Sequence, residues 1–188
     1  MTLPAVRRTL AVVTAVVLTC SAAAQDAWTE TAWAYPEPGE EVRAFVAEAT
    51  DGDDGRLVLG CRPPVGDAAT GPLFVAFESA AFAGLDLDVG RLSWRDVTAR
   101  YRPHGGEPTP ITVDFWRRSE DGGALFADGM PAQIRYPWVE AFGAAAETTF
   151  SFWVGQETDA EPDVRMTVPT LGAYEVATDQ LDCFEGAG

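Results

Sequence analysis

The chain has 188 residues, with 13 basic residues against 29 acidic ones and a formal net charge of −16 at pH 7. This charge argues against nucleic acid or an anionic membrane as a partner, because both would be repelled. The negative charge can instead serve solubility, attract a cationic partner or be balanced by bound cations. The chain contains no Lys and no Asn, which favours a GC-rich bacterial source and excludes N-glycosylation.

The first 24 residues are predicted to be a cleaved signal peptide. Arg7 and Arg8 precede an apolar run at 10–18, and alanines at 22–24 form a cleavage site before Gln25. The apolar run is too short for a membrane-spanning helix, which needs about 20 residues. We therefore expect a periplasmic or secreted protein with no stable membrane span after cleavage.

Cleavage would remove Arg7, Arg8 and Cys20, which takes the net charge from −16 to −18. The remaining residues, 25–188, suffice for a single domain. A lipoprotein anchored at Cys20 is the alternative, but it would need Gly, Ala or Ser where Thr19 stands.

Two cysteines remain after cleavage, Cys61 and Cys183. An even number in an oxidising compartment predicts one structural disulfide. A redox-active pair would normally be a C-x-x-C motif, which the chain lacks.

The mature sequence contains short apolar or alternating runs separated by turn residues, which predict β-strands. The predicted strands are residues 28–34, 42–49, 56–61, 73–78, 94–101, 111–117, 124–127, 148–154 and 164–168. Residues 111–117 alternate cleanly and precede the turn 119–123, so they predict a hairpin with 124–127. Residues 82–91 are ambiguous, and helices are predicted at 136–146 and 173–183. The pattern favours an antiparallel β-sandwich or partly open barrel with one or two short helices, over a β-rich α+β domain.

His104 is the only histidine, in a His-Gly-Gly loop like the oxyanion-hole loop of some esterases. Such an enzyme also needs a G-x-S-x-G nucleophile elbow, which is absent. No nucleotide-binding motif is present either. The sequence therefore favours a non-enzymatic protein over a hydrolase.

Acidic residues at alternate positions suggest calcium as a cofactor. Glu157, Asp159, Glu161 and Asp163 would share one face of an extended segment, where a cation would relieve their repulsion. The alternative is an ordinary solvated loop, with no cofactor at all.

Trp116 is the best candidate for a sugar-binding residue among six tryptophans, because it alternates with the apolar residues of its predicted strand. Arg117 and Arg118 follow it, and we group these three with His104 as a candidate binding surface. The alternative, which we favour, is that Trp116 packs against a second sheet or a helix.

From residue 97 onward the chain resembles periplasmic accessory proteins of the VasI/TagO type, associated with type VI secretion. The resemblance rests on Arg100-Tyr101-Arg102, Trp116, Ser119-x-Asp121-Gly122 with Ala124 and Phe126, and a final helix ending at Cys183. It implies a secreted β-rich domain with an accessory or interaction role and no known catalytic residues.

Together these features predict a non-enzymatic exported domain that binds an envelope protein or another envelope component, such as a glycan. A carbohydrate- or calcium-binding module is the first alternative, and a hydrolase is the second.

Overall fold

The structure is a computed structural model that describes residues 27–34, 40–63, 71–88, 90–93, 95–117, 123–127, 132–156, 158–181 and 183. The predicted signal peptide, Arg118, Glu157 and the turn at 119–122 lie outside these residues.

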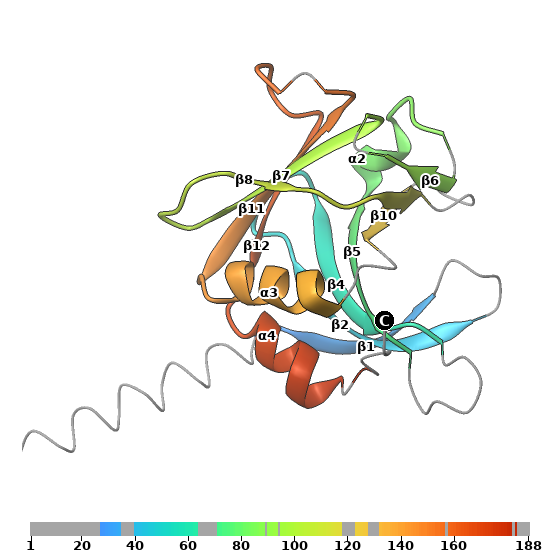
Figure 1. Cartoon of the computed structure of the whole chain (residues 1–188), viewed down its shortest axis with the longest axis vertical. Coiled ribbons are helices and arrows are strands. Elements are labelled where there is room, and N and C mark those ends of the chain that lie inside the picture. Colours follow the sequence, from blue (N-terminus) through green and yellow to red (C-terminus); the bar gives the residue numbers. More distant parts are fainter. Residues whose placement is uncertain are drawn as a thin grey trace, which may run out of the picture.

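The described strands form two antiparallel sheets (Figure 1), which confirms the predicted β-sandwich. The first sheet has seven strands in the order β1 (Thr29–Ala34), β2 (Glu41–Glu48), β4 (Gly55–Cys61), β5 (Leu73–Ser79), β10 (Ala124–Ala127), β9 (Phe115–Arg117) and β6 (Gly90–Leu92). The second has five, in the order β3 (Asp51–Gly52), β12 (Val164–Pro169), β11 (Glu147–Val154), β7 (Val97–Pro103) and β8 (Thr109–Ile111).

Aromatic side chains from both sheets form the core between them. The ring of Phe77 on β5 lies 4.9 Å from that of Phe150 and 5.0 Å from that of Phe152, both on β11. All three rings are fully buried. Because side chains alternate across a strand, the inward Phe150 and Phe152 require Ser151 to point outward.

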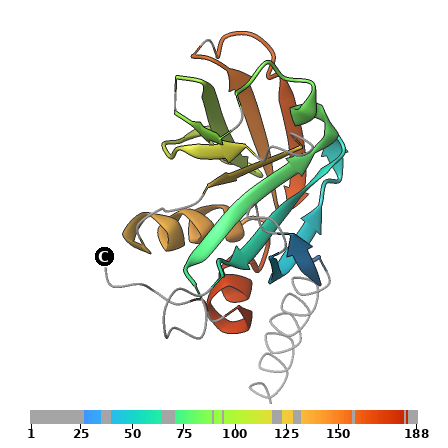
Figure 2. The ribbon, with the colours of Figure 1, turned by 90° about the vertical axis from the view of Figure 1, so that its right-hand side faces the viewer.

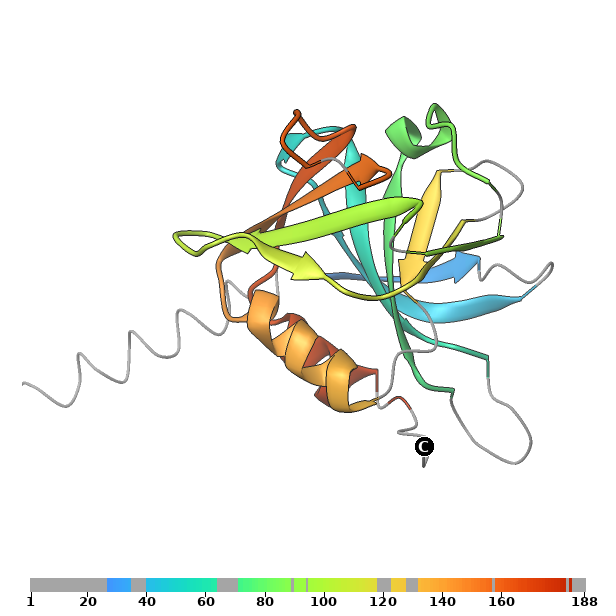
Figure 3. The same cartoon turned by 45° about the horizontal axis from the view of Figure 1, so that its top comes forward.

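Helical segments cover one end of the sandwich (Figure 3), where α3 (Ala132–Gly143) buries Val139 and Phe142. Beside α3, the short helix α4 (Ala173–Glu175) continues into the π-helical turn η1 (Val176–Gln180) (Figure 2). Another short helix, α2 (Ala80–Ala83), follows β5 and lies away from α3 and α4 (Figure 1). Both predicted helices are present, although α3 begins and ends earlier than predicted and the second ends at Gln180 rather than at Cys183. No helix in the described part of the chain is long and apolar enough to cross a membrane.

The predicted disulfide is confirmed. Cys61 at the end of β4 is bonded to Cys183, which follows η1. The two positions are 122 apart in the chain, so the bond would stabilise the fold by about 5 kcal/mol in the loop-entropy model.

Two predicted strands are wrong in extent. The strand predicted at 94–101 begins only at Val97, after a turn at 95–96, and ends at Pro103. Residues 111–117 do not form a continuous strand: β8 ends at Ile111 and β9 begins at Phe115. The chain passes between the sheets over this stretch, since β8 belongs to the five-stranded sheet and β9 to the seven-stranded one. The alternation of apolar and polar residues continues through the bend at 112–114, so the sequence pattern does not reveal that the chain changes sheets there. The β9–β10 hairpin itself is confirmed.

The ambiguous stretch also resolves into two elements, α2 and the edge strand β6. The turn at 51–55 contributes β3 to the five-stranded sheet. There Gly52 has φ +91°, and a Cβ on it would lie 2.2 Å from the carbonyl oxygen of Arg165. This close approach requires glycine.

Candidate functional site: an arginine-lined groove

The outer face of the five-stranded sheet carries arginines and hydroxyl groups. On β7 the buried Val97, Ala99 and Tyr101 alternate with Thr98, Arg100 and Arg102. The same alternation directs Thr149 and Ser151 of β11, and Arg165 of β12, away from the core. These strands therefore place arginines from two distant segments on one face.

The strand register brings the arginines close together. Ser151 on the central strand β11 lies opposite Arg100 on one side and Arg165 on the other. Arg102 lies opposite Thr149, the next outward residue of β11. Directly opposite residues have Cα atoms about 5 Å apart, so these side chains border a shared space.

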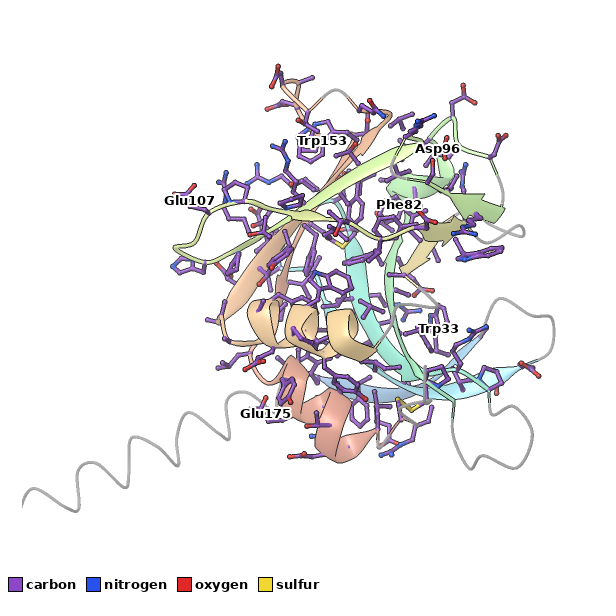
Figure 4. All side chains as sticks on the ribbon, viewed as in Figure 1. Trp33, Phe82, Asp96, Glu107, Trp153 and Glu175 are labelled. Atoms are coloured by element: carbon purple, nitrogen blue, oxygen red, sulfur yellow. A yellow bond between two sulfur atoms is a disulfide. The ribbon has the colours of Figure 1, made fainter. Side chains whose placement is uncertain are left out.

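Arg100 is held in place by the segment that connects β11 and β12. Its Nη2 donates a hydrogen bond to Oγ1 of Thr158 at 2.8 Å, and its guanidinium carbon lies 5.6 Å from the centroid of the Trp153 ring. Trp153 Nε1 in turn donates to the carbonyl oxygen of Ala160 at 3.0 Å. Figure 4 shows Trp153 beside this connection at the top of the molecule and Glu107 at the tip of the β7–β8 hairpin.

Between this connection and the hairpin is a groove with a volume of about 270 Å³. We call it the arginine groove; its lining residues are Arg100, Tyr101, Arg102, Pro108, Thr149, Ser151, Trp153, Thr158, Pro162 and Arg165. None of them is acidic. Among the described residues, no carboxylate lies within ion-pair distance, 4.0 Å, of the guanidinium groups of Arg102 and Arg165.

Guanidinium groups next to hydroxyls can bind an anion, because both donate hydrogen bonds and the guanidinium is always charged. Arg102 and Arg165 are exposed, so a ligand can reach them from solvent. The polar side chains that line the groove include arginines and the hydroxyl residues Thr149, Ser151 and Thr158. Such a lining is chemically suited to an anion.

The residues of the predicted binding surface around Trp116 lie in different parts of the structure. The side chain of Trp116 is 43% exposed on β9, so the expected packing against a sheet or helix is wrong. Arg91 lies opposite it on β6, and its Nη2 donates to Oδ2 of Asp114 at 2.6 Å. Trp116 thus stands beside an ion pair at the surface.

Arg117 points the other way and is only 8% exposed. Its guanidinium donates to the carbonyl oxygens of Phe82 at 2.9 Å and of Leu85 at 3.2 Å, and also to that of Leu87. These carbonyls belong to α2 and the residues after it, so Arg117 ties that segment to β9.

His104 lies in the β7–β8 turn of the other sheet, with Nδ1 3.4 Å from Oε1 of Glu147. The His104 side chain is 73% exposed and that of Glu147 is 44% exposed. In the described residues no serine hydroxyl forms a hydrogen bond with His104. Arg118 lies outside the described residues. The structure thus does not bring Trp116, Arg117 and His104 together on one surface.

The described acidic residues of the calcium hypothesis, Asp159, Glu161 and Asp163, are all exposed. Oδ2 of Asp163 accepts a hydrogen bond from the Val154 backbone N–H at 2.8 Å. No group of three or more metal-binding side chains gathers anywhere in the described residues.

A second, more open depression of about 630 Å³ lies beside β4, β5 and α2. Its charged residues are Glu48, Asp54, Arg56 and Glu78. Glu78 bonds to both Arg56 and Nε1 of Trp33, so its carboxylate is engaged within the protein.

Sequence reasoning missed the arginine groove, although a signal for it exists. Arg100 and Arg102 flank Tyr101, and Arg165 precedes Met166, so each arginine alternates with an apolar residue. Alternation places each arginine on the outer face of its own strand, but it does not say which strands are neighbours.

No family model, no curated protein and no solved structure compared with the chain matches it.

Proposed function

We propose that this chain is an exported, non-enzymatic binding domain of the bacterial envelope that holds an anionic ligand in the arginine groove. The observation that carries the proposal is the pair Arg102 and Arg165, on either side of β11 in a groove lined by no acid. In a chain with 29 acidic residues, an arginine-lined groove favours a ligand of opposite charge.

The proposed location rests on the signal sequence and is supported by the disulfide. Arg7, Arg8 and the apolar run at 10–18 are features of an export signal. The Cys61–Cys183 bond is compatible with an oxidising compartment. A role beside the VasI/TagO-type accessory proteins of type VI secretion remains part of this proposal.

Export is tested by expressing the full chain with a C-terminal tag in a bacterial host. The expected product lies in the periplasm or medium, begins at Gln25 and contains no free thiol. Retention in the cytoplasm with an intact N-terminus would contradict the proposed location. Lipid attachment at Cys20 would show that the exported protein is anchored to a membrane and not free.

Anion binding is tested on the mature, oxidised chain by NMR with acetate, sulfate and inorganic phosphate. We expect saturable shifts of amides on β7, β11 and β12 that the double change Arg102→Gln with Arg165→Gln removes. The matched control is Arg91→Gln, which removes an exposed arginine from the other sheet. Shifts that persist in the double variant, or no shifts at all, would overturn anion binding in the groove.

Exposure of Trp116 favours carbohydrate binding as a second candidate function. A flat indole ring stacks on the C–H face of a sugar, and the adjacent Arg91–Asp114 pair could hydrogen-bond to its hydroxyls. Purified envelope glycan should retain the wild-type chain but not Trp116→Ala. Equal retention of both would exclude this site.

Calcium is the remaining alternative, since Asp159 and Glu161 stay open to solvent. A calorimetric titration decides it: heat of binding together with a raised melting temperature would support a calcium site, and no change in either would exclude one.

A further inference from the structure

The arginine groove is bordered by acidic residues. Glu107 precedes the lining residue Pro108, Asp159 follows the lining residue Thr158, and Glu161 and Asp163 flank the lining residue Pro162. All four acids are exposed. The positively charged surface is therefore confined to the groove, with negative charge beside it.

This border limits how much negative charge a ligand can carry. A long polyanion that filled the groove would extend over the bordering acids, and like charges repel one another over a screening distance of about 8 Å at physiological salt. Its outer charges would be repelled, whereas a single anion within the groove would meet mainly the guanidinium groups. A ligand with one isolated anion avoids this repulsion.

The walls of the groove limit the shape of the ligand. The Trp153 ring is only 8% exposed and lies against the Arg100 guanidinium, so it offers little free surface on which a sugar could stack. Pro108 and Pro162 contribute small apolar surfaces at the edges. A volume of about 270 Å³ accommodates one or two small residues rather than a polymer segment.

We infer that the arginine groove binds the free C-terminal carboxylate of a short peptide with small side chains and discriminates against polyanions. The inference rests on the proposed function and specifies its ligand. Arg102 and Arg165 bind the two carboxylate oxygens, Ser151 and Thr149 offer hydroxyl donors, and the two prolines contact the terminal side chain. A carboxylate suits guanidinium forks because its two oxygens accept parallel hydrogen bonds.

The test uses calorimetry on the mature, oxidised chain with acetyl-Ala-Ala, its C-terminal amide, glucuronate, polyglutamate and inorganic phosphate as probes. We expect acetyl-Ala-Ala to bind most tightly and the amide to bind at least about tenfold more weakly, because the amide carries no charge. Arg102→Gln and Arg165→Gln should each weaken acetyl-Ala-Ala binding about tenfold. Arg91→Gln, the control on the other sheet, should leave it unchanged.

The outcomes distinguish a wrong ligand class from a wrong proposed function. Tighter binding of polyglutamate, phosphate or glucuronate that still requires Arg165 would overturn the peptide carboxylate while leaving an anion-binding groove. Equal binding of the acid and its amide would overturn the carboxylate requirement. Binding of no probe, or binding unaffected by both arginine changes, would overturn the inference and the proposed function together. Unchanged circular dichroism of the variants excludes misfolding as a cause.

Discussion

The guanidinium of Arg100 lies against the indole ring of Trp153, with 5.6 Å between the guanidinium carbon and the ring centroid. The two residues come from neighbouring strands, β7 and β11. Because Trp153 also bonds to Ala160 and Arg100 to Thr158, this pair attaches the β11–β12 connection to the sheet. It thereby sets one wall of the arginine groove.

Replacing Trp153 with Leu should loosen this wall. The change removes a largely buried ring and its hydrogen bond to Ala160, and we expect a loss of about 2–4 kcal/mol of unfolding free energy. Hydrogen exchange should accelerate at Asp163, whose N–H bonds to Phe152. Trp116→Leu, an exposed control, should change stability by less than about 0.5 kcal/mol. Equal effects of the two changes would contradict the anchoring role of Trp153.

Replacing Arg117 with Met should destabilise the fold. The guanidinium bonds to carbonyl oxygens around α2, and a Met side chain leaves them without these donors. We expect a loss of about 2–4 kcal/mol, measured by urea unfolding. Arg91→Met serves as the control, since Arg91 is an exposed arginine paired with Asp114. If both variants unfold at the same urea concentration, the burial of Arg117 contributes nothing to stability.

Removing the disulfide should lower stability without changing the fold. For Cys61→Ala combined with Cys183→Ala we expect a loss of about 2–5 kcal/mol, because the unfolded chain gains freedom between two positions that are 122 apart. Reduction of the wild-type chain should reproduce this effect in thermal unfolding. A double variant as stable as the oxidised chain would contradict the prediction.

The pKa of Asp96 is lowered from the ordinary value of 3.8, first by the hydrogen bond from the Ser93 hydroxyl and then by that from the Ser93 backbone N–H. Their lengths are 2.7 Å and 2.6 Å. A carboxyl whose pKa is depressed on folding stabilises the fold above its unfolded pKa, and this contribution is lost as the pH falls from 3.8 through the lower folded pKa.

An NMR titration of the Asp96 carboxyl tests this cause. Ser93→Ala removes the hydroxyl donor and keeps the backbone one, so the pKa of Asp96 should rise part of the way toward 3.8. The same titration curve in both proteins would rule out the Ser93 hydroxyl as the cause.

Local sequence patterns were sufficient for most strands and for the disulfide. Alternation around Phe150 and Phe152 predicts a strand with one buried face, because side chains alternate across any strand. The prediction failed at 111–117, where the alternation of Ile111, Val113 and Phe115 continues through a bend between sheets. Nothing local distinguishes one long strand from two short ones there.

The candidate site depended on tertiary structure. Sequence alone grouped Trp116, Arg117 and His104, whereas the fold places Arg117 in the interior and His104 on the other sheet.

By itself the sequence determined where most of the strands lie, which cysteines can pair and which N-terminal segment resembles an export signal, because each depends on neighbouring residues or on composition. Only the tertiary structure decided that Arg100 and Arg165 lie on either side of Ser151. Their placement depends on the register of β7 and β12 against β11. Hydrogen bonds between distant segments set this register, and no short window of sequence encodes it.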